Sequence, residues 1–229
     1  MAMLRNIPII YEDNHILVIE KPVNIPSQED SSHDPDVISI LKQDIKKRYD
    51  KPGNVYLSLV HRLDRPVGGI MVLAKTSKAA ARLSSEIREG SFKKSYLCVV
   101  NGTPQRASGF LENYLYKDAE RNIVRIVEKG VPGAKKAVLE YKTLETSKDV
   151  SLIWVKLHTG RSHQIRVQLA EIGHPLYGDQ KYGGEFAAPG EQIALWSSQI
   201  SFMHPTRGIN ISFVSKPPKQ DPWNLFHIG

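Results

Sequence analysis

The chain has 229 residues, 41% of them hydrophobic and 24% charged, and its net charge of +7 favours a polyanionic partner, although an ordinary basic enzyme would carry the same charge. A single cysteine, Cys98, excludes an internal disulfide and fits a reducing compartment. The N-terminal apolar runs are short and cut by charges, which argues against a signal peptide or a membrane span, so we expect a cytoplasmic protein.

The N-terminal third begins with strands and continues with a helix. Residues 9–22 are typical of two short strands around a turn at Asp13-Asn14. A polar loop with two prolines follows over 26–36. Helical spacing of apolar residues then predicts a helix over 37–51, with Asp36 as its N-cap.

A buried strand and a second helix come next. The apolar run 70–75 predicts the strand, and 76–90 predicts an amphipathic helix that Thr76 or Ser77 can cap and Gly90 can end. Strand-like runs joined mostly by short turns follow at 92–100, 109–116, 122–127, 137–145 and 151–158.

The C-terminal part returns to helical spacing. Apolar residues along one side predict a third helix over 159–173, and two strand-like runs, 193–203 and 209–215, precede a proline-rich end. Many strands and few helices predict an α+β fold, with a mixed, largely antiparallel central sheet flanked by a few helices. The length fits one large domain over residues 1–229, or one domain with two lobes.

The segment "HRLDRPVGG" places the carboxylate Asp64 between Arg62 and Arg65. In an extended segment Arg62 and Asp64 point to one side and His61 to the other. Pro66 and the two glycines after it give a rigid bend with room for a ligand. A carboxylate beside guanidinium groups stays ionised, which suits a nucleophile or a base. From these residues alone, an ion pair on a solvated surface remains the simpler explanation.

The start of the third predicted helix carries a second polar cluster. Thr159 or Ser162 can cap the helix, and Arg161 lies in its first turn. His163 and Arg166 are three residues apart and share a face. The N–H groups of a helix start favour a phosphate, although an exposed polar helix start would show the same residues.

Tyr96 lies on the predicted strand 92–100 and shares a face with Lys94 and Cys98. Packing in the core would explain this tyrosine as well as catalysis would. The eight histidines are scattered without the partners and spacing of a metal site, so we expect no metal.

Four segments, in this order, resemble the RluA-type pseudouridine synthases. They are "YEDNHILVIEKP", "HRLDRPVGGIMVLAKT", "KKSYLCVV" and "LHTGRSHQIRVQLAEIGHPLYGDQKYGG". The resemblance implies the pseudouridine synthase fold with its catalytic cleft. It further implies isomerisation of uridine to pseudouridine in ribosomal or transfer RNA without a cofactor. Many members of the family carry a small RNA-binding module before the catalytic domain, but the first strand-like run begins at about residue 9, so we expect a single catalytic domain without a separate N-terminal RNA-binding module. A monomer is the default expectation.

The resemblance also assigns roles to residues. Asp64 is implied as the catalytic carboxylate, acting either at the ribose (C1′ or C2′) or at C6 of the ring. Tyr96 is implied to lie against the uracil and to take part in a late proton transfer. Arg166 is implied to pair with Asp64, and Arg62 to fill the space left by a flipped-out base. The substrate-binding residues expected on this basis are His61, Arg62, Arg161, His163, Ile165 and Leu169.

Three positions depart from the family pattern. Val67-Gly68-Gly69 stands where Thr-Ser-Gly is common, so a hydroxyl is absent and Gly69 keeps the bend. Gln168 stands where a histidine is common, which removes a titrating group. Asn24 stands where a glycine is favoured, and asparagine tolerates a positive φ well.

Two other classes of function stay open from the sequence. A non-catalytic RNA-binding or RNA-folding protein on the same scaffold would not need Asp64, Tyr96 and Arg166. A glycosidase would need a second acid near Asp64. Asp179 is the only candidate within the motifs, and its glycine-rich setting is more typical of a structural turn.

Overall fold

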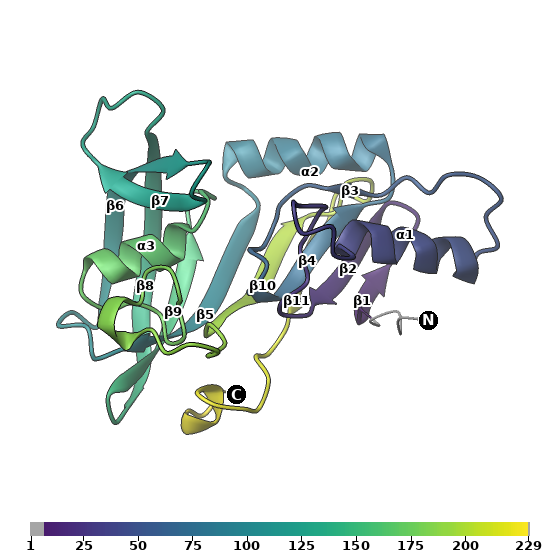
Figure 1. The fold of residues 1–229 in the computed structure, drawn as a ribbon. Coiled ribbons are helices and arrows are strands. Elements are labelled where there is room, and N and C mark those ends of the chain that lie inside the picture. Colours follow the sequence, from purple (N-terminus) through teal and green to yellow (C-terminus); the bar gives the residue numbers. More distant parts are fainter. Residues whose placement is uncertain (1–6, 229) are drawn as a thin grey trace. The chain divides into compact units, whose positions relative to one another are not determined.

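The computed structural model describes residues 7–228 and contains two compact units (Figure 1). The first unit comprises 7–92 and Ser197–Ser215, and the second comprises Lys93–Trp196 and 216–228. Within the described residues, no helix is both long and apolar enough to cross a bilayer. The chain therefore enters the second unit, returns to the first, and ends in the second.

The first unit is built on a sheet. Its strands follow the order β1 (Ile9–Glu12), β2 (Ile16–Lys21), β4 (Gly68–Ala74) and β10 (Leu195–Met203), with β3 (Ser58–Leu59) paired to β4 and β11 (Asn210–Val214) paired to β10. The pairings β1–β2, β2–β4, β3–β4 and β10–β11 are antiparallel. Asp13 forms the predicted turn between β1 and β2, because its Oδ1 accepts the N–H groups of His15 (2.7 Å) and Ile16 (2.9 Å).

Two helices of the first unit begin at the predicted caps. In α1 (Val37–Arg48) the Asp36 side chain accepts the N–H groups of Ile38 and Ser39. In α2 (Ser77–Glu89) Thr76 accepts the N–H of Ala79, and Gly90 ends the helix with φ +75°. The side chains at these caps satisfy backbone groups that a helix end leaves without partners.

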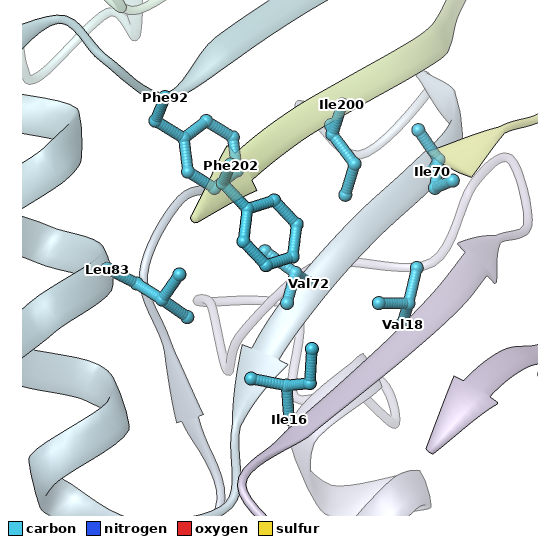
Figure 2. Packing of buried hydrophobic residues seen from close by; sticks show 8 residues of the cluster. All are labelled: Ile16, Val18, Ile70, Val72, Leu83, Phe92, Ile200 and Phe202. Carbon is cyan, nitrogen blue, oxygen red and sulfur yellow. The ribbon is translucent and has the colours of Figure 1, made fainter. Parts of the chain in front are cut away.

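An apolar core lies between α2 and the sheet of the first unit (Figure 2). It consists of Ile16, Val18, Ile70, Val72, Leu83, Phe92, Ile200 and Phe202. The rings of Phe92 and Phe202 stack with centroids 5.1 Å apart, and Leu83 reaches them from α2. This core fixes β4, which directly follows the Asp64 segment.

The strands of the second unit pair with one another in antiparallel fashion. Its strands follow the order β5 (Lys93–Asn101), β9 (Val150–Leu157), β8 (Lys135–Ser147), β6 (Ser108–Asp118) and β7 (Ile123–Val127). The helix α3 (Gln164–Glu171) packs on β6 and β7, and two short 3-10 helices, η1 (Gly184–Phe186) and η2 (Trp223–Leu225), follow later in the chain. Val167 of α3 packs against Leu115, Val124 and Ala137.

Gln168 ties α3 to the sheet of the second unit. Its side chain is fully buried, and Nε2 donates to the carbonyl of Leu111 (3.2 Å) and to Oδ1 of Asn113 (2.6 Å) on β6. The family departure at this position thus has a structural use, because an amide can bind two acceptors at once.

The predicted α+β class is confirmed, and so are the predicted strands, to within a few residues at their ends. The third helix differs from its prediction, since it begins at Gln164 instead of 159. His163 precedes it with φ +50° and no side chain caps it, so the predicted cap by Thr159 or Ser162 is wrong. Thr159 instead donates from Oγ1 to Oε1 of Gln164 (2.8 Å).

Candidate active site

Asp64 lies in the loop between β3 and β4 of the first unit. Asp64 is half-buried. Its backbone carbonyl accepts the N–H of Val67 (3.0 Å), and this hydrogen bond closes a turn around Pro66. Gly69 follows with φ +112°, and a Cβ there would lie 2.4 Å from the carbonyl oxygen of Ser197 on β10. Only glycine fits this bend, so the turn that presents Asp64 has one geometry.

A second loop holds the backbone on both sides of Asp64. Ser27 Oγ donates to the carbonyl of Leu63 (2.7 Å) and accepts its N–H (3.3 Å). Lys21 Nζ (3.0 Å) and Asn24 N (2.9 Å) both donate to the carbonyl of Arg65. Asn24 has φ +64°, as its place in the pattern predicts. The residues immediately before and after the carboxylate are therefore both fixed by the segment 21–27.

Lys21 is the most deeply buried charged group beside this loop. It ends β2 opposite Gly69, none of its surface is exposed, and Nζ also donates to the carbonyls of Pro22 (2.9 Å) and Ile25 (2.7 Å). Burial lowers the pKa of Lys21 to about 7, and the nearby charge of Asp64 acts in the opposite direction. A cation with three carbonyl acceptors thus lies within the electrostatic reach of Asp64.

The two arginines beside Asp64 have different surroundings. The guanidinium of Arg65 forms an ion pair with Asp34, lies 3.7 Å from Oδ2 of Asp30 and donates to Ser32 Oγ (2.9 Å). Arg62 is exposed, and among residues 7–228 its guanidinium has no hydrogen-bond or ion-pair partner. Arg62 is therefore available to an incoming ligand, whereas Arg65 is committed to the loop of residues 30–34.

His61 has a structural contact. Its Nε2 accepts the N–H of Val72 on β4 (3.2 Å), and its ring packs on Phe92 with centroids 5.5 Å apart. Nε2 is an acceptor here, so the proton of the neutral ring is on Nδ1. This anchors the start of the Asp64 loop to the core, and the expected contact of His61 with substrate stays a prediction.

Tyr96 lies on β5 of the second unit. It is opposite Val155 of β9 and is almost wholly buried, with 6% of its surface exposed. Ile165 and Leu169 of α3 are buried as well. Burial of this kind fits packing in the core as well as apolar walls for a uracil, so the contact of these residues with a uracil stays a prediction.

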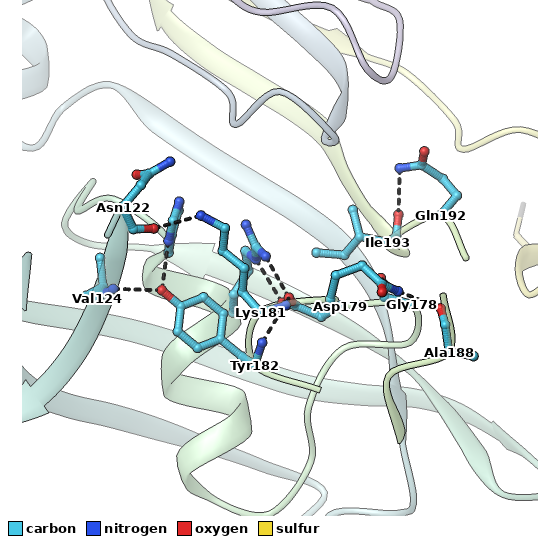
Figure 3. Close-up of polar contacts among 12 residues, drawn as sticks. Asn122, Val124, Gly178, Asp179, Lys181, Tyr182, Ala188, Gln192 and Ile193 are labelled. Carbon is cyan, nitrogen blue, oxygen red and sulfur yellow. Dashed lines mark hydrogen bonds and ion pairs between the residues drawn. The ribbon is translucent and has the colours of Figure 1, made fainter. Parts of the chain in front are cut away.

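Arg166 is held by a buried carboxylate. Its Nε and Nη2 donate to the two carboxylate oxygens of Asp179 at 2.8 and 2.6 Å. Burial acts to raise the pKa of Asp179, but the hydrogen bonds and charge of Arg166 outweigh it and hold that pKa below its usual value. Asp179 Oδ1 also accepts the N–H groups of Lys181 and Tyr182 (Figure 3). The predicted structural turn at Asp179 thus also orients a site residue.

Tyr182 joins the same network. Its hydroxyl accepts the N–H of Val124 (2.8 Å) and lies 2.7 Å from Nδ1 of His163, to which it can donate its single proton (Figure 3). The guanidinium of Arg166 stacks over the Tyr182 ring at 5.2 Å. One loop, residues 178–183, therefore sets the orientation of two predicted site residues on or next to α3.

The remaining predicted residue, Arg161, is exposed, and its Nε donates to the carbonyl of Lys136 (2.9 Å). The predicted pairing of Arg166 with Asp64 joins residues of different units, and it stays a prediction. Within residues 7–228, no group of three or more histidine, cysteine, aspartate or glutamate side chains is arranged to hold a metal ion.

Comparison with known proteins identifies the family of this chain. The family model described as RNA pseudouridylate synthase matches residues 15–171, which reach from β2 to the end of α3. The chain belongs to the RNA pseudouridylate synthase family. It is therefore an enzyme that isomerises uridine to pseudouridine within RNA.

Several relatives of this RNA pseudouridine synthase cover most of its length. It is 36% identical to an uncharacterised RNA pseudouridine synthase of Bacillus subtilis, YjbO, over 92% of this chain and 72% of the relative. It is 31% identical to ribosomal large subunit pseudouridine synthase D of Zymomonas mobilis, over 96% and 72%. The solved structure of human RNA pseudouridylate synthase domain containing 4 has the same fold, with a TM-score of 0.76 and 21% identity over 93% of this chain and 89% of that one.

Two supporting groups of this pseudouridine synthase were not predicted from the sequence. Asp179 and Lys21 both stand inside segments that resemble the family, yet neither was assigned a part in the site. A buried charge is the signal that identifies them, because a buried aspartate or lysine needs a partner close by. That signal requires the fold, since nothing in the local sequence marks either residue as buried.

Proposed function

We propose that this pseudouridine synthase acts on large-subunit ribosomal RNA and that Asp64 is its catalytic carboxylate. The substrate class is supported by the names of similar proteins, among them the large-subunit enzymes of Zymomonas mobilis and Pseudomonas aeruginosa. The role of Asp64 is supported by one observation above all. A half-buried carboxylate stands between two backbone positions that a buried lysine, an asparagine and a serine fix from another loop.

The reaction breaks the bond from N1 of uracil to C1′ of the ribose and forms a bond from C5 to C1′. The hydrogen on C5 leaves as a proton, and N1 gains one, so no oxidant or reductant is needed. Asp64 serves as nucleophile at C1′ or C6, or as base at C2′. The detached uracil must turn before it is rejoined to C1′. The fixed backbone around Asp64 keeps the carboxylate oriented during this step, so its orientation does not have to be gained in the transition state.

The target base has to leave its stack before it can react. Arg62 is exposed and uncommitted, so it can occupy the vacated space, and Tyr96 can face the uracil and accept the C5 proton. Tyr96 is buried on β5, which pairs with β9, and this burial keeps its ring in one place. Arg166, held by Asp179, supplies a positive charge whose direction is set before substrate binds.

The test uses unmodified transcripts of large-subunit ribosomal RNA and of transfer RNAs, made with uridine that is tritiated at C5. Each conversion releases one tritium, so no knowledge of the site is required. We expect D64N and D64A to release tritium at least 10³-fold more slowly than the wild type. The matched control is D44N, which removes an equal charge from an exposed helix position that pairs with Arg48.

A D64N variant that works at a normal rate would remove Asp64 from the mechanism. Release of tritium from transfer RNA alone would contradict the ribosomal substrate. Free uracil in the products would indicate hydrolysis, the glycosidase alternative. Cytoplasmic location and a monomeric state stay predictions, which cell fractionation and light scattering of the purified protein can check.

A further inference from the structure

Lys94 is a half-buried lysine whose ammonium has no polar partner among the residues that the structure describes. It lies near the start of β5, two residues before Tyr96. Burial lowers its pKa, and among residues 7–228 its ammonium has no hydrogen bond or ion pair. Lys21 shows the contrast, since that lysine is buried more deeply but donates to three carbonyls. Lys94 has the cost of desolvation without this compensation.

The surroundings of Lys94 leave room for its ammonium group. A Cβ added at Gly160 would lie 3.1 Å from Nζ of Lys94, so any side chain at 160 would press on the ammonium. Gly160 belongs to the turn between β9 and α3, next to Thr159 and Arg161. The ammonium thus lies against the turn that leads into the helix of Arg166.

Strand geometry places Lys94 beside the expected uracil contact. Side chains two apart on a strand point to the same face and are separated by roughly 6.6 Å along it. Lys94 therefore projects on the side of Tyr96. This separation is comparable with the span from a nucleotide's base to its own phosphate.

We propose that Lys94 binds the phosphate of the target nucleotide or of its immediate neighbour in RNA. An uncompensated, partly desolvated cation is unfavourable in the free protein, and a phosphate oxygen supplies the acceptor that it lacks. The inference rests on the proposed function, because it takes Tyr96 as the residue that faces the uracil. It makes Lys94 a substrate-binding residue that locates the nucleotide along β5.

The first test compares K94Q with K93Q in the tritium-release assay, in a buffer without inorganic phosphate. Lys93 is the matched control, because it is the adjacent lysine, is exposed, and points to the opposite face of the strand. We expect K94Q to lower kcat/KM at least tenfold, mainly through KM, and K93Q to change it less than twofold. The slope of log kcat/KM against log salt concentration should become shallower by about 0.7 in K94Q, the value for one phosphate contact on a single strand.

The second test needs no RNA. If the ammonium of Lys94 lacks an acceptor, K94M should leave the midpoint of thermal unfolding unchanged or raise it by a few degrees at pH 7. A lysine that held the structure together through an ion pair would lower that midpoint when replaced. This measurement separates substrate binding from a structural role and shows that the K94 variants fold.

The outcomes are distinct. A wild type that releases no tritium from either RNA would contradict the proposed function itself. An active wild type with equal kcat/KM and equal salt slopes for K94Q and K93Q would overturn the inference alone. A K94M variant that unfolds several degrees earlier than the wild type would also overturn it, because Lys94 would then have a structural partner.

Discussion

The lysine beneath the Asp64 loop makes the stability of the protein depend on pH in a specific way. In the folded state burial lowers the pKa of Lys21 to about 7, against 10.5 for a lysine in water. Between these two values the unfolded chain binds one more proton than the folded chain. The free energy of unfolding then rises with pH, because folding releases a proton. Below pH 7 both states are protonated, so Lys21 adds no pH dependence there.

The variant K21M has no titrating group at position 21. The free energy of unfolding of the wild type should therefore rise relative to that of K21M as the pH rises. Each full unit of pH between the two pKa values corresponds to ~1.4 kcal/mol. With half of Lys21 already neutral at pH 7, the relative gain from pH 7 to pH 9 is ~2.3 kcal/mol. Other titrating groups are shared by the two proteins and cancel in the difference.

The assay is urea unfolding followed by circular dichroism at half-unit steps from pH 6 to pH 9.5. K78M serves as the control, because Lys78 is an exposed lysine of α2 in the same unit, and its difference from the wild type should stay constant. A difference between wild type and K21M that stays constant within ~0.5 kcal/mol from pH 7 to pH 9 would refute the reasoning. It would mean that three carbonyls and Asp64 hold the proton on Lys21 throughout.

Three further changes test other parts of the site. D179N should lower the free energy of unfolding by about 3–5 kcal/mol in urea titrations, because it removes the buried negative charge to which Nε and Nη2 of Arg166 donate; a loss below ~1 kcal/mol would contradict this. G69A should abolish activity and reduce the yield of folded protein, since its Cβ has no space against the β10 backbone; a stable, active variant would show that this bend can relax. The pair K46Q/K47Q, at the exposed end of α1, should reduce the slope of log binding constant against log salt concentration for RNA by up to about 1.4, the value for two phosphate contacts on a single strand; an unchanged slope in filter binding would make the end of α1 a solvated helix face.

The elements of the fold that could be predicted are those with a local cause. Alternation of apolar residues marked the strands from β5 to β9, and side-chain caps at Asp36 and Thr76 marked the starts of two helices. Each of these signals acts within about four residues along the chain. The prediction of where α3 begins was wrong, because the helix starts after His163. The left-handed backbone of His163 is not indicated by any local pattern in the sequence.

The candidate residues of the site could be proposed from the sequence, whereas the groups that support them could not. Asp64 was proposed through the resemblance of its segment to the family, and its catalytic role stays a prediction. Lys21 and Ser27 bind the backbone on either side of Asp64 from about 40 positions away in the sequence. The hydrogen bonds between Asp179 and Arg166 join residues 13 positions apart. Such contacts arise only when the fold brings the segments together, and the pattern of either segment alone gives no distance between them.

Two of the six non-glycine residues with a positive φ among the described residues lie next to residues expected to react. Asn24 has a positive φ and binds the residue after Asp64, while His163 has one and precedes the helix of Arg166. A non-glycine residue in this region costs of order 1 kcal/mol, so the rest of the fold must hold it there. Both lie where a side chain has to be aimed before RNA arrives. We infer that the strain is the cost of orientation that, in a looser loop, would have to be gained in the transition state.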